Sequence, residues 1–141
     1  MSKIKNKIKK LKLKKFKLTP QRIAIINFLN HNPIHPSAET IYNHIKEDYP
    51  TISLATIYNT LEKLEEIGEL IKLKVSNTNK INYEFNTTPH QHFFCKRCTK
   101  IYDIWKEVKQ NIKIIDGHNI EEVQVCYKGT CKSCNNSKDK K

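Results

Sequence analysis

The chain has 141 residues and a formal net charge of +12. This length suits one domain of ordinary size or two very small ones. No apolar run reaches the roughly 18 residues that span a bilayer, and the first seventeen residues carry nine lysines in place of an apolar secretory segment. We therefore expect a cytoplasmic protein with no membrane segment and no secretory signal.

The basic residues are concentrated at the start of the chain. Residues 1–22 hold ten basic side chains and no acidic one, whereas residues 23–85 hold five basic and eight acidic side chains. A basic arm of this kind attracts polyanions, and nucleic acid is their commonest form for such proteins. A solvated, lysine-rich tail is the alternative interpretation.

Three helical segments and a hairpin follow the basic arm. Apolar periodicity predicts helices within residues 18–30, 35–50 and 51–68. Each has a capping residue, and Gly68 is a suitable stop for the third. The caps are Thr19, Ser37 and Ser53. Residues 70–75 and 81–85 then alternate apolar and polar side chains, which predicts a two-stranded hairpin.

The order helix, helix, helix, hairpin is that of a winged helix-turn-helix, in which the third helix enters the major groove and the hairpin is the wing. The polar side of the third helix, over residues 53–66, and two lysines of the arm are therefore candidate DNA contacts. An ordinary amphipathic helix with a solvated face is the alternative. These candidates are Lys14, Lys15, Ser53, Thr56, Tyr58, Asn59 and Lys63.

The remainder of the chain has a different composition. Residues 86–141 hold all five cysteines and three of the six histidines. We expect short strands near residues 93–95, 100–104 and 120–127, and a short helix around 105–113. The predicted fold is α+β: a winged-helix DNA-binding domain over 1–85, a hinge over 86–89, a small α/β domain over 90–136 and a disordered tail over 137–141.

Four cysteines form two CxxC pairs that predict a structural zinc site. Cys95 and Cys98 make the first pair, and Cys131 and Cys134 make the second. A CxxC turn lets two thiolates reach one ion, and two such turns complete a tetrahedron. The gap of 32 residues between the pairs requires a strand or helix to bring the second pair back. A redox-active CxxC would need a βαβ setting, which the pattern does not contain.

His90 and His92 lie just before the first CxxC pair. Residues two apart on an extended segment project to the same side, so these imidazoles form a two-nitrogen clip. Since the cysteines already have partners, the clip is available for a second metal ion. An exposed pair of surface histidines is the equal alternative at this point.

Five segments resemble the ferric uptake regulator (Fur) family in order and spacing, over roughly residues 17–134. They read LTPQR, HPSAETIY, SLATIYNTLEKLEEIG, HQHFFCKRCTKIYD and CKSC. The resemblance implies a cytoplasmic bacterial repressor rather than an enzyme. It implies a homodimer with a C-terminal dimerisation domain, a zinc ion on the four cysteines, and binding to AT-rich palindromic double-stranded DNA operators.

The resemblance also implies a regulatory Fe²⁺ or Mn²⁺ site at the hinge between the domains. The matching ligands are His35, Glu84, His90, His92 and Asp103. Arg22 matches an arginine of the family that contacts the DNA backbone, whereas Asn59 stands where family members commonly have arginine.

The carboxylates of this implied site are a mixed set. Asp103 is typical of the family's peroxide sensors, whereas Glu84 stands where those sensors usually have aspartate. We give Asp103 more weight and expect a peroxide-responsive repressor, in which iron-catalysed oxidation modifies His35 or His90 and releases the metal and the operator. An iron-responsive or other metal-responsive regulator is the alternative within the family. Outside it, a zinc-ribbon RNA-binding protein and a CxxC thiol oxidoreductase remain to be separated.

Overall fold

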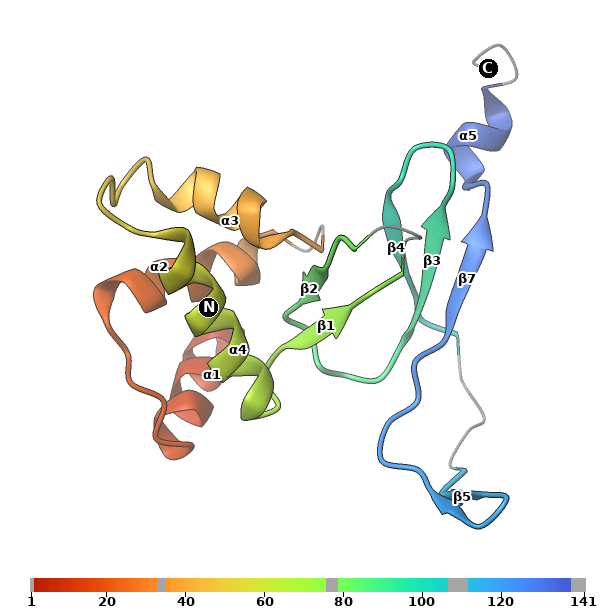
Figure 1. The fold of residues 1–141 in the computed structure, drawn as a ribbon, viewed down its shortest axis with the longest axis horizontal. Helices are drawn as coiled ribbons and strands as arrows, with labels where there is room; N and C mark the ends of the chain where they lie inside the picture. Colours follow the sequence, from red (N-terminus) through yellow and green to blue (C-terminus); the bar gives the residue numbers. More distant parts are fainter. Residues whose placement is uncertain (1, 33–34, 76–78, 107–111, 138–141) are drawn as a thin grey trace. The chain divides into compact units, whose positions relative to one another are not determined.

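The computed structural model describes residues 2–32, 35–75, 79–106 and 112–137. The chain divides into two compact units, Met1–Thr87 and Thr88–Lys141 (Figure 1). Among the described residues, no helix is both long and apolar enough to cross a membrane.

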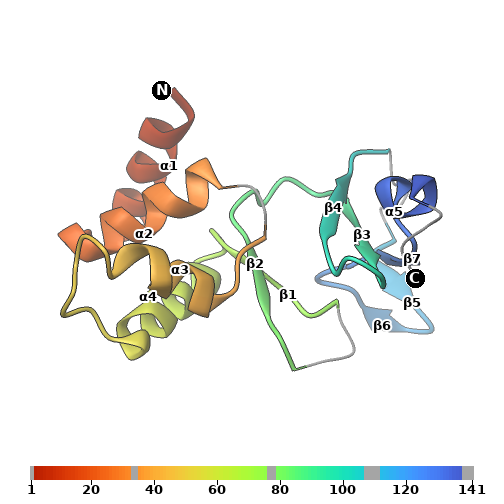
Figure 2. The ribbon, with the colours of Figure 1, turned by 90° about the horizontal axis from the view of Figure 1, so that it is seen from above.

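The described residues of unit 1 form four helices and a two-stranded antiparallel hairpin (Figure 2). The elements that follow α1 come in the order of a winged helix-turn-helix, which confirms the prediction. They are α1 (Ser2–Leu13), α2 (Pro20–His31), α3 (Ala38–Ile45), α4 (Leu54–Glu66), β1 (Ile71–Leu73) and β2 (Asn82–Glu84).

The three predicted helix caps are confirmed. The side-chain oxygens of Thr19, Ser37 and Ser53 each accept a hydrogen bond from the backbone N–H three residues further on. Each bond satisfies one of the N–H groups that a helix leaves without a partner at its start. Pro20 occupies the first turn of α2, where its missing N–H costs nothing.

The core of unit 1 lies between the apolar sides of its helices. Ile25, Ile41, Ile57 and Leu61 are completely buried. Leu11 of α1 is also completely buried in this cluster, so the basic arm is a helix that belongs to the core. Ile4 and Ile8 are partly buried beside it, whereas Leu13 and most of the lysines remain at the surface.

The end of α4 is fixed by a glycine. Gly68 has a left-handed φ of 76°, and its N–H bonds to the carbonyl of Glu65 while the N–H of Glu69 bonds to that of Leu64. This pair of bonds is a Schellman motif, which ends a helix and turns the chain sharply. The turn carries the side chain of Glu69 into the interior of unit 1, where the residue is only 1% exposed.

Lysines of α1 surround this buried carboxylate. The ammonium groups of Lys7 and Lys14 lie 3.0 and 2.7 Å from the oxygens of Glu69, and that of Lys10 lies 3.7 Å away. Burial by itself raises the pKa of Glu69, but the hydrogen bonds from Lys14 and Lys7 outweigh it and lower that pKa. Lys7 also donates to the carbonyl oxygen of Phe85 at 3.1 Å and lies over its ring.

Unit 2 is built on a three-stranded sheet of order β4-β3-β7. Strand β3 pairs antiparallel with β4 and parallel with β7. A separate hairpin precedes β7, and a short helix follows it. The elements are β3 (Gln91–Cys95), β4 (Ile101–Ile104), β5 (Ile114–Ile115), β6 (His118–Asn119), β7 (Cys126–Gly129) and α5 (Lys132–Asn136).

The predictions for unit 2 were right for β3 and β4 and wrong for the last strand. The strand expected over 120–127 begins only at Cys126, and β5 and β6 precede it. Asp116 and Gly117 join β5 to β6 with φ values of 49° and 81°, the conformation of a tight hairpin turn. The helix expected over 105–113 falls largely on residues 107–111, which lie outside the described residues.

We predict that Glu69→Ala destabilises unit 1 by about 1–3 kcal/mol, because three lysines lose a buried counter-charge. The folded-state pKa of Glu69 is lowered from its usual value of 4.5, so its contribution is complete above that pH and is lost as pH falls through the lower value. Urea unfolding of the two proteins at pH 7 and at pH 3–4 measures this. The difference between them should shrink at the lower pH.

Glu66→Ala is the matched control, since Glu66 is an exposed residue in the last turn of α4. It should change the free energy of unfolding by less than about 0.5 kcal/mol. Equal effects of the two substitutions would show that the lysine cluster does not stabilise the fold.

Candidate metal centres and nucleic-acid interface

The first CxxC pair lies in the turn between β3 and β4. The N–H of Cys95 bonds to the carbonyl of Lys100 at 3.0 Å, and the N–H of Thr99 bonds back to the carbonyl of Cys95 at 2.9 Å. Thr99 has a left-handed φ of 62°, which tightens the turn. The N–H of Cys98 points at the sulfur of Cys95, 3.5 Å away. The two sulfurs are therefore presented from one side of a short, hydrogen-bonded turn.

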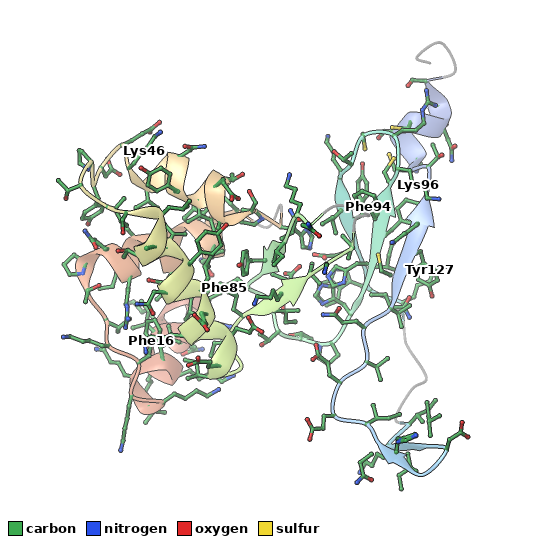
Figure 3. The ribbon with its side chains drawn as sticks, in the orientation of Figure 1. Phe16, Lys46, Phe85, Phe94, Lys96 and Tyr127 are labelled. Atoms are coloured by element: carbon green, nitrogen blue, oxygen red, sulfur yellow. The ribbon has the colours of Figure 1, made fainter. Side chains whose placement is uncertain are left out.

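The second pair is brought back by the parallel strand β7. Its residue Gly129 lies opposite Cys95 in the sheet register, so the chain emerges beside the first pair. Cys131 then takes the N-cap position of α5, with its N–H 3.3 Å from the sulfur of Cys95. This parallel return explains the 32-residue gap between the two pairs. In Figure 3 the sulfur atoms gather where β3 approaches α5.

The four sulfurs have the spacing of a zinc site. Cys95 and Cys134 are 3.8 Å apart, Cys98 and Cys131 are 3.7 Å apart, and all four sulfurs lie within 4.8 Å of one another. A tetrahedron with zinc–sulfur bonds of about 2.3 Å has sulfur–sulfur edges of about 3.8 Å. The cluster therefore matches a structural site with four thiolates, as the spacing predicted.

Hydrogen-bond donors favour the thiolate forms of two of these cysteines. Burial raises the pKa of Cys95, but backbone N–H groups, including that of Cys131, outweigh it and lower the value to about 6. The hydroxyl of Tyr102 donates to the sulfur of Cys131 at 3.4 Å and is the main cause of its lowered pKa. The bond to Cys131 raises the pKa of Cys134 to about 12. A divalent cation would remove this difference between the cysteines, since it favours deprotonation of all four thiols.

A second group of metal-ligand side chains lies on the same sheet of unit 2. Asp103 of β4 stands opposite His92 of β3 in the antiparallel register. Its carboxylate oxygen Oδ1 lies 3.0 Å from Nε2 of His90 and 3.5 Å from Nε2 of His92. The two imidazole rings have centroids 4.5 Å apart. The predicted histidine clip and Asp103 therefore converge within unit 2.

The orientation of His90 suits metal binding. Its Nδ1 lies 2.6 Å from the carbonyl oxygen of Thr88, which can only accept a hydrogen bond, so Nδ1 carries a hydrogen. In the neutral ring, Nε2 then directs its lone pair towards Asp103. Nε2 of this ring and Oδ1 of Asp103 are then both acceptors, and two acceptors only 3.0 Å apart require a proton or another cation between them. Stacking on Trp105, with centroids 4.3 Å apart, holds the ring in this orientation.

Unit 1 carries the other two predicted ligands. Nε2 of His35 contacts Oε2 of Glu84 on β2. Asn82 donates to the carbonyl of His35 at 2.7 Å, and Tyr83 donates its N–H to the carbonyl of Pro36 at 2.9 Å. These bonds fix the segment before α3 along the wing strand. His35 adopts a left-handed φ of 54°, a conformation that histidine tolerates better than most residues.

The predicted base-reading surface of α4 is partly exposed. Tyr58 is 42% exposed, and Asn59 and Lys63 are also exposed. The hydroxyls of Ser53 and Thr56 are hydrogen-bonded to each other at 2.9 Å at the cap of the helix. This first turn is therefore fixed before any ligand arrives.

Two of the predicted basic contacts, Lys14 and Arg22, already have partners within unit 1. Lys14 binds Glu69 as described above and also donates to the carbonyl of Ile67 at 2.7 Å. Arg22 donates to the carbonyl of Lys17 at 2.9 Å and lies over the ring of Phe16. Lys15 is exposed at the C-terminal turn of α1. The role of Glu69 could not be identified from the sequence, since only the tertiary fold brings α1 beside the end of α4.

Unit 2 exposes much of its apolar surface. Among its described residues, the buried hydrophobic side chains are those of Cys95 and Cys131. Six of its large apolar side chains have exposed fractions between 44% and 61%. They are Trp105, Ile112, Ile114, Ile115, Val123 and Tyr127. A small unit without an apolar core of its own needs a metal or a partner for stability.

These features define a winged-helix protein with a four-cysteine zinc unit and further metal ligands. The model of the Ferric uptake regulator family matches residues 14–128, and the chain belongs to that family.

Individual relatives are similar over most of the chain. The peroxide-responsive repressor PerR of Staphylococcus saprophyticus is 35% identical over 122 residues, which cover 84% of this chain and 82% of that protein. The structure of PerR from Streptococcus pyogenes, described as a basis for peroxide sensing and gene regulation, has a TM-score of 0.56 and 30% identity, covering 93% of this chain and 92% of that one.

The iron-containing structure of the ferric uptake regulator from Francisella tularensis has a TM-score of 0.69 and 26% identity, covering 85% of this chain and 95% of that one. Since the family consists of regulators, the expectation that the chain is not an enzyme is confirmed. Membership of the family also removes the zinc-ribbon RNA-binding protein and the thiol oxidoreductase.

We predict that Cys131→Ser removes the zinc ion and unfolds unit 2, because zinc contributes on the order of 10–16 kcal/mol in small finger peptides. The expected stoichiometry falls from about one tightly held zinc per chain to near zero. Metal analysis after mild chelation and amide exchange of residues 91–104 measure both effects. Cys126→Ser is the control, since Cys126 does not belong to the four-sulfur cluster and its sulfur contacts the carbonyl of Tyr127 at 3.6 Å. Zinc retained by the Cys131 variant would contradict the assignment.

Proposed function

We propose that this protein is a metal-dependent transcriptional repressor that responds to peroxide. It acts in the bacterial cytoplasm as a homodimer on an AT-rich palindromic DNA operator. Residues 1–85 bind DNA, 86–89 form the hinge, and 90–136 hold the structural zinc and dimerise. The observation that carries the proposal is a group of metal-ligand side chains within each unit: His35 and Glu84 in the first, and His90, His92 and Asp103 in the second.

One regulatory ion is bound by both halves of this ligand set. The three imidazoles and two carboxylates suit Fe²⁺ or Mn²⁺. An ion held by both units stabilises only the arrangement in which the two half-sites meet. It therefore shifts the conformational equilibrium by its differential affinity for that arrangement. DNA binding follows because only one arrangement of the two units suits the operator.

Peroxide acts on the histidines of the same site. When bound, Fe²⁺ would supply the electron that reduces peroxide, and Mn²⁺ would not under the same conditions. His35 and His90 are the oxidation-sensitive residues, and an oxidised ring binds the ion less well. The aspartate at position 103 and relatives named for their response to peroxide support this assignment.

The dimer is supported by the apolar surface of unit 2. Side chains such as Ile114, Ile115 and Tyr127 are about half exposed, and a second copy would remove them from water. A twofold dimer presents two α4 helices, which suits a palindromic operator. The exposed side chains of Tyr58, Asn59 and Lys63 are then the contacts to the bases and phosphates of each half-site.

An iron-responsive uptake regulator is the second candidate. Glu84 favours it, because the peroxide sensors of the family usually carry aspartate at that position. The two functions share the metal site and the DNA-binding surface. They differ only in whether the bound iron reacts with peroxide, so they are separated by chemistry rather than by binding.

Operator release is expected only when iron and peroxide are present together. The protein is loaded with Fe²⁺ or Mn²⁺ and bound to a duplex that it has selected from a random pool, and each complex is treated with peroxide. The Fe²⁺ form should lose the duplex and gain 16 Da, the mass of one oxygen, on the peptide containing His35 or His90. The Mn²⁺ form should do neither. Retention of the duplex by the treated Fe²⁺ form would favour the iron-responsive regulator.

Asp103→Glu is expected to lower the rate of peroxide inactivation of the Fe²⁺ form, with DNA affinity of the Mn²⁺ form kept within a few-fold. The longer side chain keeps the charge but moves the ligand oxygen relative to His90 and His92. Timed peroxide exposure followed by gel-shift titration measures the effect. Glu66→Asp, which changes an exposed carboxylate of the same charge, is the control. An unchanged rate would mean that Asp103 does not determine the response.

A further inference from the structure

The exposed tyrosine of α4 has a partner on another helix. The hydroxyl of Tyr58 donates a hydrogen bond to Oε1 of Glu39 at 2.9 Å. Glu39 lies in the first turn of α3 and is exposed, as is Tyr58. Both residues belong to unit 1, so their distance does not depend on the other unit. They line a surface hollow of about 440 Å³ together with Lys80, which follows the wing turn.

The carboxylate of Glu39 is held in its charged form. Its pKa is lowered first by the backbone N–H of its own residue at the start of α3, and then by the hydrogen bond from Tyr58. Ser37 and the positive charge of Lys80 contribute in the same direction. The hydrogen bond to Glu39 correspondingly raises the pKa of Tyr58. At neutral pH the pair therefore consists of a carboxylate that accepts and a phenol that donates.

The pair is not needed to hold the two helices together. Ile41 of α3 and Ile57 of α4 are completely buried in the shared core, which already fixes the packing. An exposed hydrogen bond adds only about 0.5–1.5 kcal/mol, and a carboxylate on a DNA-facing surface repels phosphates. A negative charge at this place therefore lowers the affinity for DNA of any sequence. A gain in sequence selectivity would offset this loss of affinity.

The hydrogen bond determines what the phenol can recognise. Since the only hydroxyl hydrogen of Tyr58 is directed at Glu39, the oxygen offers lone pairs alone. In the major groove, guanine and thymine present acceptors, which repel it and the nearby carboxylate. Adenine N6 and cytosine N4 present amino donors, which can pair with it.

We infer that Glu39 is a specificity-determining residue, which makes Tyr58 an acceptor for an exocyclic amino group of adenine or cytosine. This inference rests on the proposed function, in that α4 must enter the major groove. It assigns Glu39 a role in selecting the base rather than in binding DNA strongly.

Binding-site selection tests the inference. The full-length, Mn²⁺-loaded protein and its variants each select from a pool of randomised duplexes, and affinities are then measured for the selected site and its single-base-pair changes. Glu39→Ala and Tyr58→Phe should both relax the preference at the same base pair of each half-site, by a factor on the order of ten. Glu39→Gln retains an acceptor oxygen and should keep the preference within about twofold while binding all duplexes more tightly, since one negative charge is gone.

The controls separate the possible failures. Glu66→Ala removes the same charge from the far end of α4 and should leave the preference unchanged. If the wild-type protein selects no sequence, the proposed function is wrong. If it selects a sequence and Glu39→Ala keeps the same preference, the inference alone is wrong. If Glu39→Gln relaxes the preference as much as Glu39→Ala, the charge of Glu39 rather than its hydrogen bond determines the base preference. The assignment of Tyr58 as an acceptor is then wrong. If a Glu39 variant fails to fold, the Tyr58→Phe variant still tests the inference.

Discussion

The four-thiolate cluster is the constraint on which the rest of unit 2 depends. In the described part of this unit, the buried hydrophobic side chains are those of two of the zinc-binding cysteines, so the metal takes the place of an apolar core. The same strand, β3, carries His92 within it and Cys95 at its end. The structural ion therefore holds the strand that presents His92, one of the ligands in the proposed regulatory site.

In unit 1 a comparable role falls to a buried charge. The Schellman turn at Gly68 places Glu69 among the lysines of α1, which fixes this helix to the end of α4. Part of the large positive charge of the arm is thus neutralised within the fold. The lysines that remain exposed are those available for phosphates. Net charge therefore overstates the electrostatic attraction for DNA, because Lys7 and Lys14 act structurally.

The winged helix also illustrates how affinity and selectivity differ. Lysines increase attraction to any duplex, whereas the carboxylate of Glu39 opposes it and restricts the hydrogen bonding of Tyr58. In the proposed metal site, the mixed set of Glu84 and Asp103 likewise provides the same charge as either uniform set but a different position for each ligand oxygen.

The sequence by itself determined the features that are local. Caps at Thr19, Ser37 and Ser53, the stop at Gly68 and the CxxC turns depend on bonds within a few residues, and the family motifs supplied the ligands of the proposed regulatory site. The turn at Asp116 and Gly117 was equally local and was overlooked. Only the tertiary structure decided the parallel return of β7 beside β3, the burial of Glu69 and the bond between Glu39 and Tyr58. These depend on contacts between distant segments, whose pairing the periodicity of one segment does not specify.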